Sequence, residues 1–106
     1  MSRTISNLPF SVRAKADVQD NGEVVWPLED ALDAINALAD SGQVILGLDF
    51  WEYDENQRIL EMPWNAYEPE GKSTDVESGR RTALEEFARA VEVLSLTSQN
   101  WVLITW

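Results

Sequence analysis

Histidine and cysteine are both absent from the 106 residues of this chain. Histidine is the most common general acid or base, cysteine is the most common thiol nucleophile, and the two together supply most zinc and copper ligands. Their absence excludes most enzyme classes and all disulfide bonds. The glycine patterns of phosphate loops and dinucleotide-binding turns are missing as well. We therefore predict that the protein is not an enzyme and that it uses no cofactor and no metal.

Long hydrophobic runs are also missing. No apolar stretch approaches the roughly 20 residues that cross a bilayer, and no basic segment followed by an apolar run marks a secretion signal. We therefore expect a cytoplasmic protein. Because 44% of the residues are hydrophobic, the chain can bury one core of ordinary size, and residues 1–106 are predicted to form a single domain.

Basic residues are few, with 8 Lys and Arg against 19 Asp and Glu, which gives a formal net charge of −11. Such a surface repels nucleic acid and anionic membranes, so neither is expected as a partner. It attracts basic proteins, and nucleases are often basic because they must neutralise phosphate. The alternative, that the acidity serves only solubility, is equally compatible with the charge taken alone.

The clearest predicted helix lies between Pro27 and Gly42, because proline suits the first helical turn and glycine the C-terminal stop. Its apolar residues recur at helical spacing: Leu28, Ala31, Leu32, Ile35, Leu38 and Ala39. Its other face is almost purely acidic: Glu29, Asp30, Asp33, Asn36 and Asp40. A second amphipathic helix is predicted over residues 74–95, with Thr74 and Glu77 at capping-box spacing.

Strands are predicted from alternating or continuous apolar segments bounded by turn residues. They cover residues 10–18, paired through a tight turn with residues 24–26; residues 43–53 as a central strand; residues 58–62 after a turn at residues 54–57; and residues 101–106. The fold class is therefore predicted as α+β, with a mainly antiparallel sheet of four to five strands and two amphipathic helices packed on one face. The apolar terminal strand must be docked. The protein is expected to be a monomer, or a weak homodimer if this strand pairs with its own copy.

Several carboxylates lie close together in and after the predicted central strand. Asp49, Glu52, Asp54 and Glu55 do not match a calcium-binding loop, and Asp54 and Glu55 are typical of a solvated turn. Asp49 lies between the apolar residues Leu48 and Phe50, so it needs a partner if the strand is buried. Arg80, on the apolar side of the second helix, is our hypothesis for that partner.

The five tryptophans divide into two groups. Trp26, Trp101 and Trp106 lie on apolar strands and are predicted to be core residues. Trp51 and Trp64 flank the acidic hairpin and the loop that follows. With Tyr53 and Tyr67 they are compatible either with the core or with an aromatic surface inside an acidic rim, which suits a binder of a basic protein.

A family resemblance joins several of these segments. It rests on Trp26-Pro-Leu-Glu-Asp-Ala-Leu-Asp-Ala-Ile, on Gly42, on Val44-Ile-Leu-Gly-Leu-Asp-Phe-Trp51, and on Trp64-Asn65. The pattern resembles the bacterial polymorphic-toxin immunity proteins of the immunity protein forty family. The resemblance covers most of the chain from Trp26 to Val91, and the matching positions are Gly47, Asp49, Trp51 and Trp64.

The resemblance implies a protein that binds and neutralises the toxin domain encoded beside it, as in contact-dependent growth inhibition, by stoichiometric binding and without a cofactor. The acidic charge makes a basic nuclease our first expectation for the toxin. Two surfaces are predicted to bind it. One comprises Asp49, Trp51, Glu52, Tyr53, Asp54, Glu55, Trp64, Tyr67 and Glu68; the other comprises Asp30 and Asp33 on the first helix.

Two other functions remain open on the sequence. An acidic mimic of nucleic acid would inhibit several DNA-binding enzymes, whereas an immunity protein binds one cognate partner. An enzyme or small-ligand module built on carboxylates alone would show a metal-dependent or bell-shaped pH response.

Overall fold

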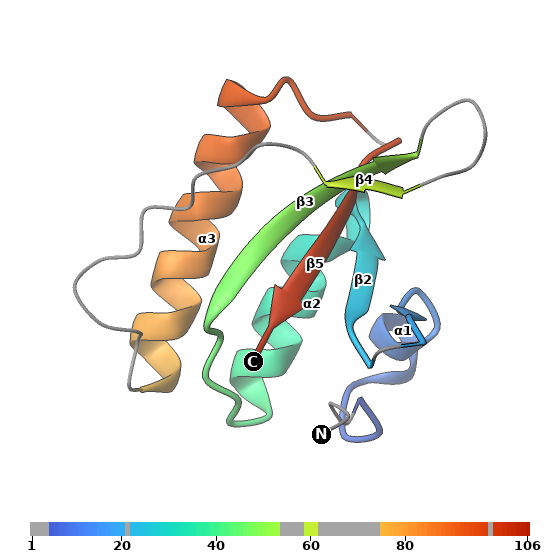
Figure 1. Ribbon diagram of the computed structural model, residues 1–106. Helices are drawn as coiled ribbons and strands as arrows, with labels where there is room; N and C mark the ends of the chain where they lie inside the picture. Colours follow the sequence, from blue (N-terminus) through green and yellow to red (C-terminus); the bar gives the residue numbers. More distant parts are fainter. Residues whose placement is uncertain (1–4, 21, 54–58, 62–74, 98) are drawn as a thin grey trace.

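The computed structural model describes residues 5–20, 22–53, 59–61, 75–97 and 99–106. Their elements are α1 (Phe10–Arg13), β1 (Asp17–Val18), β2 (Val24–Pro27), α2 (Leu28–Asp40), β3 (Gly47–Tyr53), β4 (Ile59–Glu61), α3 (Val76–Val93) and β5 (Trp101–Thr105). The strands form one antiparallel sheet in the order β1-β2-β5-β3-β4. Helices α2 and α3 cover one face of it (Figure 1). The predicted α+β class, with two helices on one face, is confirmed.

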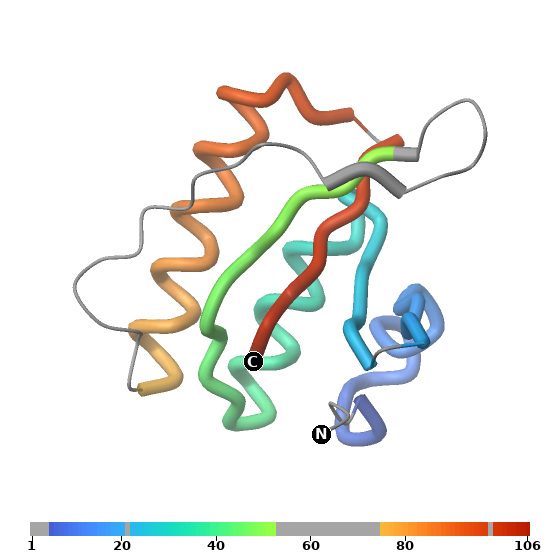
Figure 2. Tube along the Cα trace, viewed as in Figure 1, coloured from blue at the N-terminus to red at the C-terminus, as the bar shows by residue number. Residues whose placement is uncertain are grey.

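The last strand of the chain is the central strand of the sheet. β5 pairs with β2 on one side and with β3 on the other, so segments from three distant parts of the sequence lie side by side (Figure 2). The strand predicted over residues 43–53 begins only at Gly47, and it lies inside the sheet between β5 and β4. Since β5 has a neighbour on each side, it offers no free edge to a second copy, and that basis for a homodimer was wrong.

The core lies between the sheet and the two helices. Successive side chains of a strand point to opposite faces, and the residues that face the helices are buried: Val24, Trp26, Leu48, Phe50, Val102 and Ile104. They pack with Ala31, Ala34, Ile35 and Leu38 of α2 and with Ala83, Phe87 and Ala90 of α3. Leu32 was predicted to be in this core but is 44% exposed, because the helix turns it away from the sheet.

The N-terminal segment differs from the prediction. Residues 10–18 were expected to be a strand, but they form the short helix α1 and only two residues of β1. The indole nitrogen Nε1 of the buried Trp26 donates a hydrogen bond of 3.0 Å to the carbonyl oxygen of Val12. Leu8 and Val12 are buried, whereas Phe10 is 75% exposed. A long-range contact with Trp26, which local periodicity does not reveal, therefore positions this segment.

Helix α2 is held at both ends by backbone hydrogen bonds. At its start, the amide of Leu28 donates to the carbonyl oxygen of Asn100, at 3.0 Å. At its end, the amide of Gln43 donates to Leu38 and that of Gly42 to Ala39, the two bonds of a Schellman motif. Gly42 has the positive φ of +88° that this motif requires. The predicted stop at Gly42 is confirmed.

The N-cap residue of helix α3 lies one position later in the sequence than predicted. Asp75, and not Thr74, is the N-cap residue, and its carboxylate accepts a 2.8 Å hydrogen bond from the amide of Ser78. A second bond comes from the Ser78 hydroxyl, at 3.0 Å. Both bonds favour the ionised carboxylate, so they lower the pKa of Asp75. The predicted apolar stripe is confirmed at Ala83 and Phe87, which are buried.

Gly79 allows α3 to approach the segment before β3. A Cβ atom at this position would lie 2.9 Å from the backbone nitrogen of Ile45 and 3.0 Å from its carbonyl oxygen. We predict that Gly79→Ala destabilises the protein by about 1–3 kcal/mol, the usual cost of overpacking, although alanine is favoured over glycine in a helix. Urea unfolding measures this change. Gly47→Ala is the control, because no atom of the residues that the structure describes lies within 4 Å of its Cβ position. Equal stability of the two variants would contradict the prediction.

Ser95 follows α3 with a positive φ of 53°, a conformation that costs a non-glycine residue about 1 kcal/mol. The amide of Leu96 donates to Val91 across it, as in the Schellman motif after α2. We predict that Ser95→Gly raises the free energy of unfolding by about 0.5–1 kcal/mol. The matched control is Ser41→Gly, where φ is −87° and glycine should destabilise. A lower melting temperature for Ser95→Gly would contradict the conclusion that the positive φ of Ser95 destabilises the protein.

Candidate functional site

The structure places Asp30 and Asp33 on one side of the sheet and Asp49 and Trp51 on the other. Asp30 and Asp33 lie on α2, which covers one face. Asp49 and Trp51 alternate along β3 with the core residues Leu48 and Phe50, so they belong to the opposite face. Tyr53 ends β3, and the exposed Glu52 precedes it. Asp54, Glu55, Trp64, Tyr67 and Glu68 lie outside the described residues.

The strand register assembles the sheet face that is opposite the helices. Asp49 is the cross-strand partner of Leu103, which in turn is opposite Val25 on β2. Trp51 is opposite Trp101. Val25 and Leu103 are buried, whereas Asp49, Trp51 and Trp101 are half-buried. Two tryptophans and a carboxylate therefore share one partly exposed face, which we call the Trp51–Trp101 face.

Trp101 and Trp106 do not share one environment. Both were predicted to be core residues. Trp106 packs against the helix-side core, with its ring centroid 6.0 Å from that of Trp26. Trp101 lies on the opposite face beside Trp51, so the prediction for it was wrong. Sequence reasoning missed this pairing because it depends on the register between β3 and β5.

Asn100 lies directly before β5 and supports the Trp51–Trp101 face through hydrogen bonds. Its side-chain nitrogen Nδ2 donates to the carbonyl oxygen of Trp51, at 3.3 Å, and its oxygen Oδ1 accepts from the amide of Thr97, at 2.9 Å. Its own carbonyl accepts from Leu28 at the start of α2. It is 7% exposed, so these bonds satisfy polar atoms that water barely reaches. The side chain of Asn100 thus ties β3 to the residues that precede β5, and its backbone carbonyl holds the start of α2.

Arg80 does not pair with Asp49, contrary to our hypothesis. Its nitrogen Nη2 lies 2.7 Å from an oxygen of Asp40 and 3.3 Å from one of Glu77, and Nη1 donates to Oδ1 of Asn36 at 3.2 Å. The bond to Asp40 is the main reason that the pKa of Arg80 is raised. Arg80 therefore fastens α3 to the end of α2. Asp49 lies on the far side of the sheet, out of its reach.

The acidic residues of α2 differ in what they do for the helix. Glu29 and Asp30 lie in its first turn, where negative charge interacts favourably with the helix dipole. Asp40 lies at the unfavourable C-terminal end, but Arg80 compensates it. Asp33 lies in the middle of the helix and makes no hydrogen bond or ion pair with any residue that the structure describes. Its neighbours Glu29 and Asp30 are of like charge at i−4 and i−3, which destabilises a helix.

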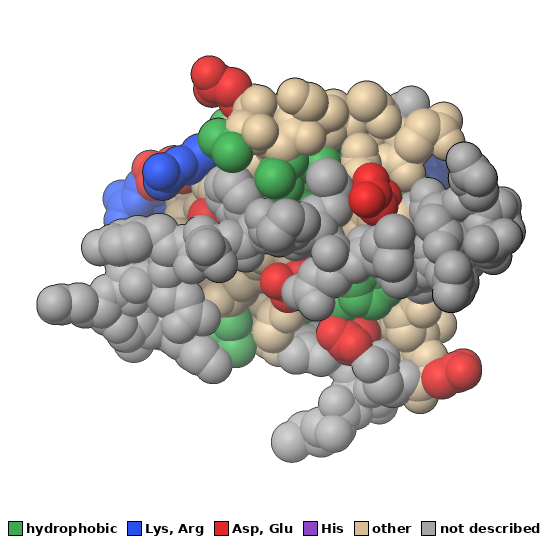
Figure 3. Space-filling view, turned by 45° about the horizontal axis from the view of Figure 1, so that its top comes forward, with side chains coloured by type: hydrophobic (Ala, Val, Ile, Leu, Met, Phe, Trp, Pro, Cys, Tyr) green, Lys and Arg blue, Asp and Glu red, His purple; other side chains and the backbone are tan. Residues whose placement is uncertain are grey.

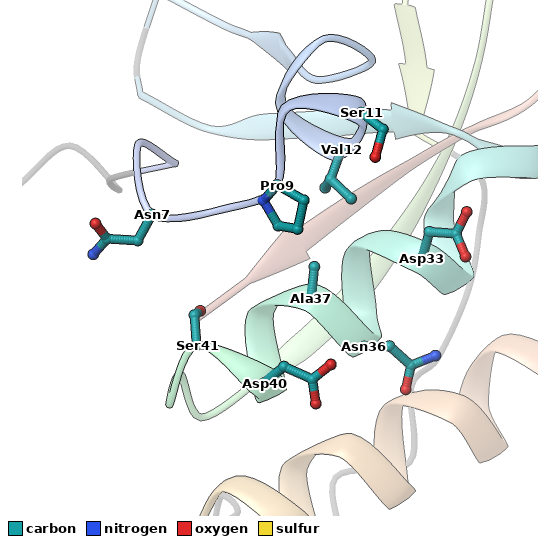
Figure 4. Close-up of a pocket in the computed structure, with 9 residues that line it drawn as sticks. All are labelled: Asn7, Pro9, Ser11, Val12, Asp33, Asn36, Ala37, Asp40 and Ser41. Carbon is teal, nitrogen blue, oxygen red and sulfur yellow. The ribbon is translucent and has the colours of Figure 1, made fainter.

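A groove runs between the N-terminal segment and α2, with a volume of about 430 Å³. Pro9 and Val12 face Ala37 across its floor, and Ser11 and Asp33 lie at one end (Figure 4). Asn36 and Asp40 also line it, on the side toward α3. Asp33, exposed and without a partner among the described residues, thus borders a concave surface with an apolar floor. Sequence reasoning predicted the acidic helix but missed the groove, which depends on the docking of α1.

Acidic side chains occur at several separate places on the molecular surface shown in Figure 3, whereas lysine and arginine show only near its edges. Within the described ranges, no group of three acidic side chains is placed to hold a metal ion. None of the helices in these ranges is long and apolar enough to span a membrane. The described acidic side chains are thus spread over the surface and not gathered into one ion site.

Most positions that carry the family resemblance have structural roles. Trp26, Leu48 and Phe50 are core residues, and Gly42 ends α2. Asp49 and Trp51 are the described exceptions, because they point away from the helices. At Gly47, no atom of the described residues lies within 4 Å of the Cβ position.

A scan against protein-family models, a search of curated proteins and a search of solved structures each found no match to this chain. The resemblance to the immunity protein forty family therefore stays a prediction.

We predict that Asn100→Ala lowers the free energy of unfolding by about 1–3 kcal/mol, because the amide of Thr97 and the carbonyl of Trp51 lose their side-chain partner. Hydrogen exchange at the Thr97 amide should speed up in this variant. The exposed neighbour Gln99 provides the control, since Gln99→Ala should change stability by less than about 0.5 kcal/mol. If both substitutions have the same small effect, Asn100 does not tie these elements together.

Proposed function

We propose that this protein is a bacterial immunity protein that binds one secreted toxin domain in the cytoplasm and neutralises it. The observation that carries the proposal is the uncompensated acidic face of α2. Asp33 contributes neither to the helix dipole nor to an ion pair among the described residues, and it adds like-charge repulsion. A charge that destabilises its own helix is expected where the same charge contributes to the binding of a basic partner.

Three further observations support the proposal. The net charge of −11 favours fast association with basic proteins, and it disfavours direct binding of nucleic acid. Histidine and cysteine are absent, so inhibition by binding is chemically simpler than catalysis. The residues from Trp26 to Trp51 resemble those of known immunity proteins. The toxin that suits this charge best is a basic nuclease, because such enzymes neutralise phosphate.

The first experiment is capture of partners on the tagged chain from its native host at low salt, followed by an activity assay of the captured protein. We expect one partner, a domain from the end of a large secreted protein, whose toxic activity is lost at a 1:1 ratio. Capture of several nucleic-acid enzymes would instead favour an acidic nucleic-acid mimic. A partner that keeps full activity in the complex would contradict neutralisation.

Charge reversal then shows which surface binds. We predict that Asp33→Lys slows association with the captured toxin by about tenfold at low salt, with a smaller effect at high salt, because steering is screened. Stopped-flow association kinetics measure this. Asp49→Lys tests the Trp51–Trp101 face on the other side of the sheet, and Glu92→Lys, on the exposed side of α3, is the control of equal charge change. If Asp33→Lys and Glu92→Lys behave alike, α2 is not the binding surface.

A further inference from the structure

The groove between α1 and α2 combines an apolar floor with one available carboxylate. Val12 and Ala37 are only 7% and 8% exposed, and the ring of Pro9 lies beside them. Of the two carboxylates in the lining, Asp40 already binds Arg80, whereas Asp33 makes no such bond with any described residue. The groove therefore has one unpaired negative charge at the end of an apolar trough.

We propose that this groove is a recognition pocket for an arginine side chain of the basic protein partner. The guanidinium group pairs with Asp33, and the aliphatic stem lies along Pro9, Val12 and Ala37. Arginine combines a charged, forked head with an apolar stem, so both parts of the groove are matched. Its volume of about 430 Å³ is within the range of roughly 300–1,000 Å³ that is typical of ligand pockets.

Other features of the groove fit the same occupant. The hydroxyl of Ser11 borders the groove at the same end as Asp33 and adds a polar acceptor near the head group. The two described cations of the N-terminal segment, Arg13 and Lys15, do not line the groove. Arg13 lies instead over the exposed ring of Phe10, with its guanidinium carbon 5.9 Å from the ring centroid.

This inference deepens the proposed function, because it names the chemical group that one of the two candidate surfaces recognises. It is testable without the partner. The probe is the capped tripeptide Gly-Arg-Gly, titrated into the isotope-labelled chain and followed by amide chemical shifts. The matched peptide carries citrulline, which has nearly the same shape as arginine but no charge.

We expect the arginine peptide to shift the amides of Ser11, Asp33 and Ala37, and the citrulline peptide to leave them unchanged. Asp33→Asn should weaken binding about three- to fivefold, the effect of losing one exposed ion pair. Glu92→Gln, which removes the same charge from the exposed side of α3, should leave the affinity unchanged. Ser11→Tyr, which narrows the groove without a change of charge, should also weaken binding.

Two results would overturn the proposal: equal shifts from the two peptides, or equal affinity of the Asp33→Asn and Glu92→Gln variants. Both substitutions replace exposed residues, so thermal unfolding should show that the variants remain folded.

Failure of this inference can be distinguished from failure of the proposed function. If a toxin is captured and only Asp49→Lys slows its binding, the protein is an immunity protein but the groove is not its recognition pocket. If the peptide binds but no toxin is neutralised, the pocket stands and the immunity function fails.

Discussion

The insertion of β5 between β2 and β3 is the constraint on which the rest of this structure depends. These three strands come from the beginning, middle and end of the described chain, and their pairing brings Trp26, Phe50 and Val102 into one row beneath the helices. Asn100, directly before β5, accepts a hydrogen bond from α2 and donates one to β3. The helices therefore have a complete surface to pack on only after the end of the chain has docked. Such long-range pairing also requires the chain to lose entropy by closing long loops before the contacts between the strands can stabilise it.

This arrangement separates the molecule into two functionally distinct sides. The sheet places Asp49, Trp51 and Trp101 on one side, and α2 places Asp33 and the groove on the other. A single partner of ordinary interface size, about 800 Å² on each protein, would cover one of these sides and leave the other free. The two surfaces are consequently alternatives, and charge reversal on each side distinguishes them. The contact between Trp26 and Val12 is part of the same arrangement, because it holds one wall of the groove in place.

The sequence predicted the parts of the fold that rest on local patterns. The helix between Pro27 and Gly42 and the apolar stripe of α3 follow from residues three and four apart, which a helix brings to one face. The N-terminal strand failed for the opposite reason: residues 10–18 are held by the indole of Trp26, which lies far along the chain. The proposed pair of Asp49 and Arg80 failed because strand alternation and helix placement put the two residues on opposite sides of the sheet.

By itself, the sequence determined the acidic charge, the lack of histidine and cysteine chemistry, the α+β class and the acidic outer face of α2, because composition and short-range periodicity are properties of the chain alone. Only the tertiary structure decided that β5 is the central strand, that Trp51 and Trp101 share a face, that Arg80 compensates Asp40, and that Asp33 borders a groove. The physical reason is that register, docking and ion pairing join residues that are distant in sequence. Many pairings are compatible with the same local pattern, and the packing of the whole core selects one of them.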